Sequence, residues 1–376
     1  MGAEQTYVYS PDYAVPPGDT LLEVMESLGI TQAELAERTG RPTKTINEIV
    51  KGKAAITPET ALQLERVLGA PASFWNNLEQ NYRTARARAA ERERLEGQIK
   101  WLKGIPVRSL VQMKWVDEHS DPVRQLQAML SFFGVASIEA WQDLWGGMKR
   151  ATAFRQSLAY QSDYPVIAAW LRKGELEARA IECQPFDPSR FRDTLAEARG
   201  LTADPQSIPD RLVKLSAAAG VAVAFVPELP KLRLWGATRW LTPEKALIQL
   251  SLRYKTDDHL WFTFFHEAGH VLLHGKRTVF VENTPVGVEP TQTATPQGTE
   301  EEEAQANKFA ADFLVPPERY REFVDGGVES CGAIMAFANE LGIAPGIVAG
   351  RLQHDNVIPY SSCNGLKIRF RWIERD

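Results

Sequence analysis

The residues best suited to chemistry in this chain are His266, Glu267 and His270, which form an H-E-x-x-H motif inside a strongly apolar segment. On a helix, two histidines four residues apart project from one face and can share a metal ion, while the glutamate turns toward a water on that metal. The alternative is that both histidines are ordinary helix residues. The apolar context weighs against it, because burying polar side chains without partners is costly. We therefore predict a catalytic zinc site at which a metal-activated water performs hydrolysis.

Such a site needs a third protein ligand. His274 lies four residues beyond His270, but positions 266 and 274 would stand about 12 Å apart along a helix axis, too far for both to reach one ion. We expect His274 to support the site without binding the metal.

A better third ligand is Glu303, in a helix predicted over residues 299–314, with Thr299 and Glu302 as its capping box. Glu303 shares the apolar face of that helix, where a carboxylate needs a charge partner. Glu300 is the next candidate, and Asn307 could orient a ligand one turn later.

Together these motifs resemble the ImmA/IrrE family of bacterial zinc metallopeptidases over roughly residues 205–376. The resemblance implies that His266, His270 and Glu303 bind zinc and that Glu267 is the general base. It also implies that the substrate is a DNA-binding repressor. From the residues alone, strands are expected at 221–226 and, as a hairpin, at 236–241 and 246–252, ahead of the H-E-x-x-H helix. This order fits a zincin-like α+β domain, with a loop over residues 282–298.

A second informative stretch lies near the N-terminus. Residues 31–40 read as a short helix ended by glycine, and residues 41–52 as a second short helix after a tight turn, the helix-turn-helix arrangement. The second helix of this motif enters the major groove with its N-terminal side chains at base edges. We expect base contacts from Thr43, Lys44, Thr45 and Asn47, and phosphate contacts from Gln32 and Lys51. The alternative is a small helical bundle used only for protein contact.

Residues 14–82 resemble the HigA-type branch of the XRE-like regulators. The resemblance implies a homodimer that binds operator DNA and often neutralises a toxin. The charge of the chain favours DNA binding only locally. The whole chain carries 43 basic and 48 acidic residues, a net charge of −5. Any affinity for DNA must therefore come from the basic patch between Arg38 and Lys53 and from dimerisation.

The remaining segment is residues 83–200. A charged helix is expected over residues 81–103, and its arginines could approach DNA, although we expect them to face water. The segment continues with aromatic residues at helical intervals, typical of a packed all-helical connector. The fold class is thus a mostly α helix-turn-helix and connector followed by an α+β domain.

The chain has three widely separated cysteines, Cys183, Cys331 and Cys363. Their number and spacing predict neither a disulfide framework nor a cysteine zinc site, so we expect the protein to reside in a reducing cytoplasm. No apolar run is long enough to predict a membrane span.

Two functions remain open from the sequence. In the first, a cytoplasmic transcriptional regulator carries a zinc endopeptidase that cleaves a regulatory protein. In the second, a HigA-like antitoxin or repressor carries a peptidase-like domain that senses a ligand or protein, such as a toxin, and never cleaves.

Overall fold

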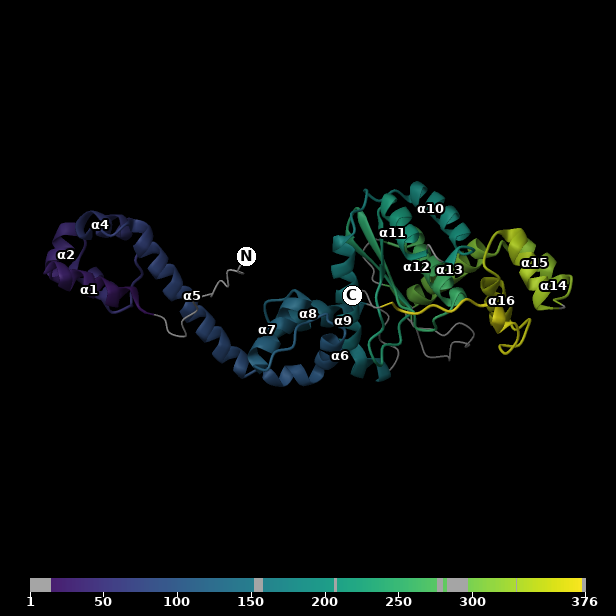
Figure 1. Cartoon of the computed structure of the whole chain (residues 1–376), viewed down its shortest axis with the longest axis horizontal. Coiled ribbons are helices and arrows are strands. Elements are labelled where there is room, and N and C mark those ends of the chain that lie inside the picture. Colours follow the sequence, from purple (N-terminus) through teal and green to yellow (C-terminus); the bar gives the residue numbers. More distant parts are fainter. Residues whose placement is uncertain are drawn as a thin grey trace, which may run out of the picture. The chain divides into compact units, whose positions relative to one another are not determined.

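The computed structural model describes residues 15–373 except 152–157, 206–207, 276–279, 283–296 and 329. Most of the predicted loop at 282–298 therefore lies outside the described residues. The chain forms two compact units, residues 1–99 and 100–376, and each is considered by itself (Figure 1). The predicted boundaries at residues 82 and 200 stay predictions.

In the first unit, the residues from 15 onward form helices and the turns between them, without strands. Its helices are α1 (Pro17–Leu28), α2 (Gln32–Thr39), α3 (Thr43–Val50), α4 (Pro58–Leu68) and α5 (Ala72–Glu96). Thr31 begins α2 by accepting a hydrogen bond from the amide of Glu34, and Gly40 ends it with a φ of 67°, a backbone conformation that glycine adopts without strain. Apolar residues from all five helices, among them Leu35, Ile46 and Trp75, form one core. This core fixes the angle between α2 and α3. The second half of α5 is largely exposed, as expected for the charged helix, but the α-helix ends at Glu96 and a 3₁₀ helix, η1 (Ile99–Gly104), follows.

The second unit is built around a four-stranded sheet in the order β1-β3-β2-β4. Strand β1 (Val221–Phe225) pairs in parallel with β3 (Lys245–Leu250), while β2 (Gly236–Thr242) is antiparallel to both β3 and β4 (Phe280–Glu282). The predicted hairpin is confirmed, with Thr242 opposite Lys245 at its turn. Six helices precede the strands: α6 (Val107–Gln112), α7 (Pro122–Phe133), α8 (Ile138–Ala151), α9 (Leu158–Ala180), α10 (Pro188–Leu201) and α11 (Ile208–Ala218). Helix α12 (Asp257–Leu273) lies between β3 and β4. After β4 come α13 (Gln297–Leu314), α14 (Pro317–Asp325), α15 (Cys331–Leu341), α16 (Pro345–His354) and the 3₁₀ helix η4 (Asn364–Leu366).

Both faces of the sheet are covered. Val221 and Val223 belong to a core that includes residues of α10, α11, α12 and α13, whereas Ala222 and Ala224 belong to a second core with residues of α7, α8 and α9. Successive strand residues point to opposite faces, so a continuous apolar strand is buried on both sides. The helices expected to form a connector thus supply one of the two layers that enclose the sheet. Gln249 anchors α9 to the sheet by donating to the carbonyl of Trp170 at 2.7 Å.

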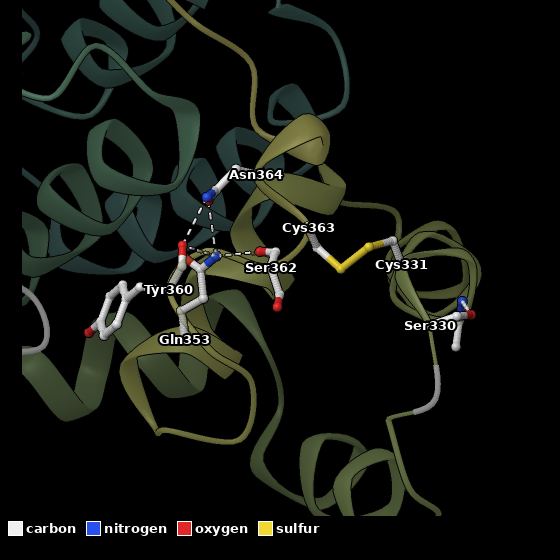
Figure 2. The surroundings of a disulfide bond; sticks show 8 residues. Ser330, Cys331, Gln353, Tyr360, Ser362, Cys363 and Asn364 are labelled. Atoms are coloured by element: carbon white, nitrogen blue, oxygen red, sulfur yellow. Dashed lines mark hydrogen bonds between the residues drawn. A yellow bond between two sulfur atoms is a disulfide. The ribbon is translucent and has the colours of Figure 1, made fainter.

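Cys331 and Cys363 form a disulfide bond with their Cα atoms 5.5 Å apart, so the expectation of no disulfide is wrong (Figure 2). The bond joins the first residue of α15 to the segment that follows α16. Gln353 holds the same segment by donating to the carbonyl of Ser362 at 2.7 Å. A separation of 32 residues between the two cysteines gives no sign in sequence that folding brings them together.

Within the described residues, no single helix is long and apolar enough to cross a membrane, although α15 and α16 meet that test as a bent pair by length and composition only.

Candidate metal centre and helix-turn-helix surface

Helix α12 carries the H-E-x-x-H residues through the centre of the second unit. Its acidic first turn, Asp257 and Asp258, suits the positive end of the helix dipole, and the residues from Leu260 to Val271 are almost all buried. The helix ends at Leu273, so His274 has an extended backbone with φ −116° and ψ 166°. The helical spacing expected to separate His266 from His274 therefore does not continue to His274.

A close approach of α13 to α12 completes the site. A Cβ atom built on Gly269 would lie 3.2 Å from both the Cα of Ala306 and the Cδ1 of Phe309, a tight contact that a larger residue could make only if α13 shifted. Glu303 lies one turn before Ala306, so this approach brings its carboxylate to the two histidines. Helix α13 begins at Gln297, two residues before the predicted start, and the side chain of Glu300 lies outside what the structure describes.

The structure brings His266, His270 and Glu303 together. The two Nε2 atoms are 3.0 Å apart, and the Glu303 carboxylate oxygens lie 3.2 Å from Nε2 of His266 and 3.5 Å from Nε2 of His270. One ligand atom from each residue falls within 4.8 Å of the others, as needed to hold one metal ion. Two imidazole nitrogens and one carboxylate oxygen are a donor set typical of catalytic zinc, so these residues fit the predicted metal.

The electrostatics of the three residues also suit a metal. Burial lowers the pKa of His270 to about 4, although Glu303 acts in the opposite direction. Burial alone would raise the pKa of Glu303, but hydrogen bonds with His266 and His270 outweigh it and lower the pKa to about 2. At neutral pH His270 is thus neutral and Glu303 ionised, the protonation states that metal binding requires.

The remaining ring nitrogens of the two histidines are held by polar residues. Nδ1 of His266 lies 2.9 Å from Oδ1 of Asn307, and Nδ1 of His270 lies 2.8 Å from Nδ1 of His274. Nε2 of His274 is in turn 3.2 Å from Oε1 of Gln305. Asn307 and His274 therefore lie where residues that orient metal ligands are found. Gln305 was not expected, because it does not share the helix face of Glu303.

Glu267 is fully buried beside this cluster. Its backbone carbonyl accepts a hydrogen bond from Thr238 at 3.2 Å, and its side chain lies against the first residue of β2. A Cβ atom built on Gly236 would be only 2.6 Å from Oε1 of Glu267 and 2.6 Å from Cγ2 of Thr263. The position of the Glu267 carboxylate thus depends on a glycine that no sequence motif singled out.

In the first unit, α3 carries the four side chains expected to contact bases, two of which are exposed. Thr43 and Lys44 are exposed in its first turn, and Thr45 and Asn47 are half-buried. The Asn47 side chain donates to Oε1 of Gln32 at 3.2 Å, which ties the start of α2 to α3. Lys51 is exposed just after α3.

Comparison with known proteins agrees with both modules. The helix-turn-helix family model matches residues 21–75, and the model of the IrrE N-terminal-like domain matches residues 236–352. The uncharacterized HTH-type transcriptional regulator YddM of Escherichia coli (strain K12) is 34% identical over 71 residues, 19% of this chain and 76% of that protein. Virulence-associated protein A of Dichelobacter nodosus is 38% identical over 74 residues, 19% of this chain and 72% of that protein.

Solved structures that are similar include the Pseudomonas aeruginosa antitoxin HigA with the higBA promoter, at 31% identity and a TM-score of 0.22, covering 23% of this chain and 94% of that one. A HigA-family addiction module antidote protein from Coxiella burnetii is 29% identical with a TM-score of 0.21, covering 22% of this chain and 92% of that one.

The chain belongs to the helix-turn-helix regulators. Its C-terminal part is an IrrE-like domain.

Proposed function

We propose that this chain is a DNA-binding transcriptional regulator whose C-terminal domain is a zinc-dependent endopeptidase that cleaves a regulatory protein. The observation that carries the proposal is the meeting of His266, His270 and Glu303 from two helices, with Glu267 buried beside them. Zinc held there would acidify its bound water and polarise the scissile carbonyl. Glu267 accepts the proton as general base, while Asn307 and His274 keep the two imidazoles oriented.

Metal content tests the ligand assignment. We expect about one zinc per purified chain, lost in His270→Ala but mostly kept in His274→Ala, because His274 contacts Nδ1 of His270 whereas Glu303 and His266 lie at its Nε2. Metal analysis by mass spectrometry on both variants gives the answer. If His274→Ala loses the metal and His270→Ala keeps it, the assignment is wrong.

Activity is tested separately from metal binding. Because Glu267 is not a ligand in this proposal, Glu267→Gln should keep zinc and the fold while losing general-base assistance, typically worth about a hundredfold to ten-thousandfold in rate. The measurement is reporter induction in cells, with target integrity followed by blot. Equal induction with an uncleaved target in wild type and variant would refute cleavage.

The alternative function is a HigA-like antitoxin or repressor whose IrrE-like domain is a non-cleaving sensor. The observation that favours it is the burial of the catalytic set, since His266 and His270 are each 1% exposed and Glu267 is 0% exposed. A sensor needs the shape of the site and not its base, so Glu267→Gln would then respond like wild type. The same reporter assay separates the two functions.

For the first unit we propose a homodimer that binds palindromic operator DNA through α3. Lys44 is exposed and Asn47 half-buried one turn later on α3, the helix expected to enter the major groove, and Lys51 follows the helix. Lys44→Ala or Asn47→Ala should weaken binding and relax sequence preference. Lys51→Ala should lower affinity for all sequences and flatten the salt dependence. Operator binding that survives removal of residues 1–104 would contradict this assignment.

A further inference from the structure

A small depression lies along α12 from the candidate metal centre. Its cavity volume is about 10 Å³, room for about one water-sized group, and it opens to solvent between the residue before β2, the turn from β3 to α12 and the first turns of α12. Its walls include Trp235, Arg253, Tyr254, His259 and Thr263.

Helical spacing places this depression on the same side of α12 as the metal centre. His259 and Thr263 precede His266 and His270 by seven residues, about two turns, so all four share one face. Between the two places β2 packs tightly against α12, because a Cβ atom built on Gly236 would lie 2.6 Å from both Cγ2 of Thr263 and Oε1 of Glu267. A polypeptide that crosses the metal centre in extended form and runs parallel to α12 would pass over this contact and reach the depression.

The distance between the metal centre and the depression determines which substrate side chain would enter the depression. Seven residues of helix correspond to about 10 Å along the axis of α12. An extended peptide advances about 3.3 Å per residue. The depression thus suits a side chain about three residues from the bond to be cleaved.

The chemistry of the walls is cationic and rich in hydrogen-bond donors. The Arg253 guanidinium lies 6.0 Å from the ring centre of Trp235 and 5.8 Å from that of Tyr254, and Lys255 is exposed beside it. Neither cation forms an ion pair with any residue that the structure describes. Burial lowers the pKa of His259, whose ring stacks on Tyr254 at 4.3 Å, so the positive charge comes from Arg253 and Lys255.

Two buried donors in the same walls point to an acceptor ligand. The indole Nε1 of Trp235, a residue only 5% exposed, and the hydroxyl of Thr256 are buried and have no hydrogen-bond partner among the described residues. A buried donor without a partner carries a free-energy cost, which an oxygen acceptor removes.

The turn that carries these groups is held in place by its neighbours. Lys255 has a φ of 57°, a left-handed conformation that is uncommon for a residue other than glycine. Its carbonyl accepts from the amide of Phe370 at 2.7 Å, and Ser251 donates through its amide to the carbonyl of Trp235 at 2.8 Å. Arg369, paired with Thr256 across an isolated bridge, adds a further positive charge near the turn.

From these observations we infer that the depression lined by Trp235, Arg253, Tyr254 and His259 is a substrate subsite for an acidic side chain, aspartate or glutamate, about three residues from the scissile bond. This inference rests on the proposed endopeptidase function.

The first test uses the full-length, zinc-loaded chain and a degenerate decapeptide library, with cleavage sites read by mass spectrometry. Aspartate and glutamate should be enriched about three positions from the cleaved bond. For one acidic peptide chosen from the library, Arg253→Glu should lower kcat/KM about tenfold to a hundredfold, because hydrogen bonds to charged groups are among the stronger ones. Arg253→Gln serves if the reversal of charge prevents folding. Lys214→Gln, an exposed lysine on α11, is the matched control and should leave kcat/KM unchanged.

A binding measurement keeps the subsite testable without cleavage. Fluorescein-labelled copies of one octapeptide, with glutamate, glutamine or lysine at the chosen position, are titrated by anisotropy into full-length Glu267→Gln. Glutamate should bind about tenfold more tightly than lysine, and Arg253→Glu in the same background should remove the difference.

The two proposals fail in different ways. Cleavage without acidic enrichment, together with equal binding of the three peptides, overturns the subsite and leaves the endopeptidase standing. The endopeptidase proposal is wrong if the zinc-loaded wild type cuts no peptide, or if it cuts peptides no faster than Glu267→Gln does. In that case equal binding of the glutamate and lysine peptides overturns the subsite as well, and preference for glutamate supports an acidic-peptide sensor site.

Discussion

Gly236→Ala should disable the candidate catalytic base without touching the metal ligands. The added Cβ would lie 2.6 Å from Oε1 and 2.9 Å from Cγ of Glu267, whereas ordinary contacts begin near 3.4 Å. The Glu267 carboxylate must therefore move by about 0.8 Å, the difference between 3.4 and 2.6 Å, unless β2 gives way. A misplacement of about 1 Å can cost roughly a hundredfold in rate. Overpacking should also lower the free energy of unfolding by about 1–3 kcal/mol.

The assay combines kcat/KM on a peptide cleaved by the wild type, zinc content and the thermal unfolding midpoint. Zinc should stay near one per chain, because the three atoms nearest to the added Cβ belong to Glu267 and Thr263 and not to the proposed ligands. Gly200→Ala is the matched control, since a Cβ at that position on α10 meets nothing within 4 Å. Adding Glu267→Asp to Gly236→Ala shortens the acid by one methylene and should recover part of the lost activity.

Two results would refute the reasoning. A Gly236→Ala protein that keeps wild-type kcat/KM would show that Glu267 tolerates displacement or is not the base. Loss of zinc in a folded Gly236→Ala protein would show that β2 positions the ligands and not Glu267.

The histidine pair and Glu303 were accessible from sequence because each follows from helical periodicity. His266 and His270 share one face of any helix that contains them, and Glu303 heads an apolar face of its own helix. The structure brings these three residues together, although their role as metal ligands stays a prediction. The helix-turn-helix was equally accessible, since Thr31 and Gly40 mark the two ends of a short helix.

What the sequence could not supply depends on contacts between distant segments. The all-apolar strand at 221–225 predicts a sheet buried on both faces. It does not reveal that α9, more than forty residues earlier, covers one of them. The contact between Gly236 and Glu267 and the bond between Cys331 and Cys363 likewise arise only once the chain has folded.

Two further predictions concern stability. Cys331→Ser should lower the free energy of unfolding by about 3–4 kcal/mol, the loop-entropy value for a 32-residue separation. Dithiothreitol should lower the free energy of unfolding of the wild type by the same amount and leave that of Cys331→Ser unchanged, with Cys183→Ser as the control. A wild type whose free energy of unfolding is unaffected by reduction would contradict this prediction. The second concerns Asp257, where burial and then the nearby Asp258 charge raise the pKa from 3.8 to about 7. Between about pH 4 and pH 7 the folded state therefore binds more protons than the unfolded state. The contribution of Asp257 to the free energy of unfolding is thus complete below pH 4 and is lost as the pH rises through 7. Asp257→Asn cannot ionise, yet it keeps a side-chain oxygen. That oxygen can still accept the hydrogen bond that the Ile368 amide donates to Asp257 at 3.0 Å. The decline in unfolding free energy from pH 4 to pH 7, measured by urea titration, should thus be shallower in Asp257→Asn than in wild type, and parallel curves would show that Asp257 ionises normally in the folded chain.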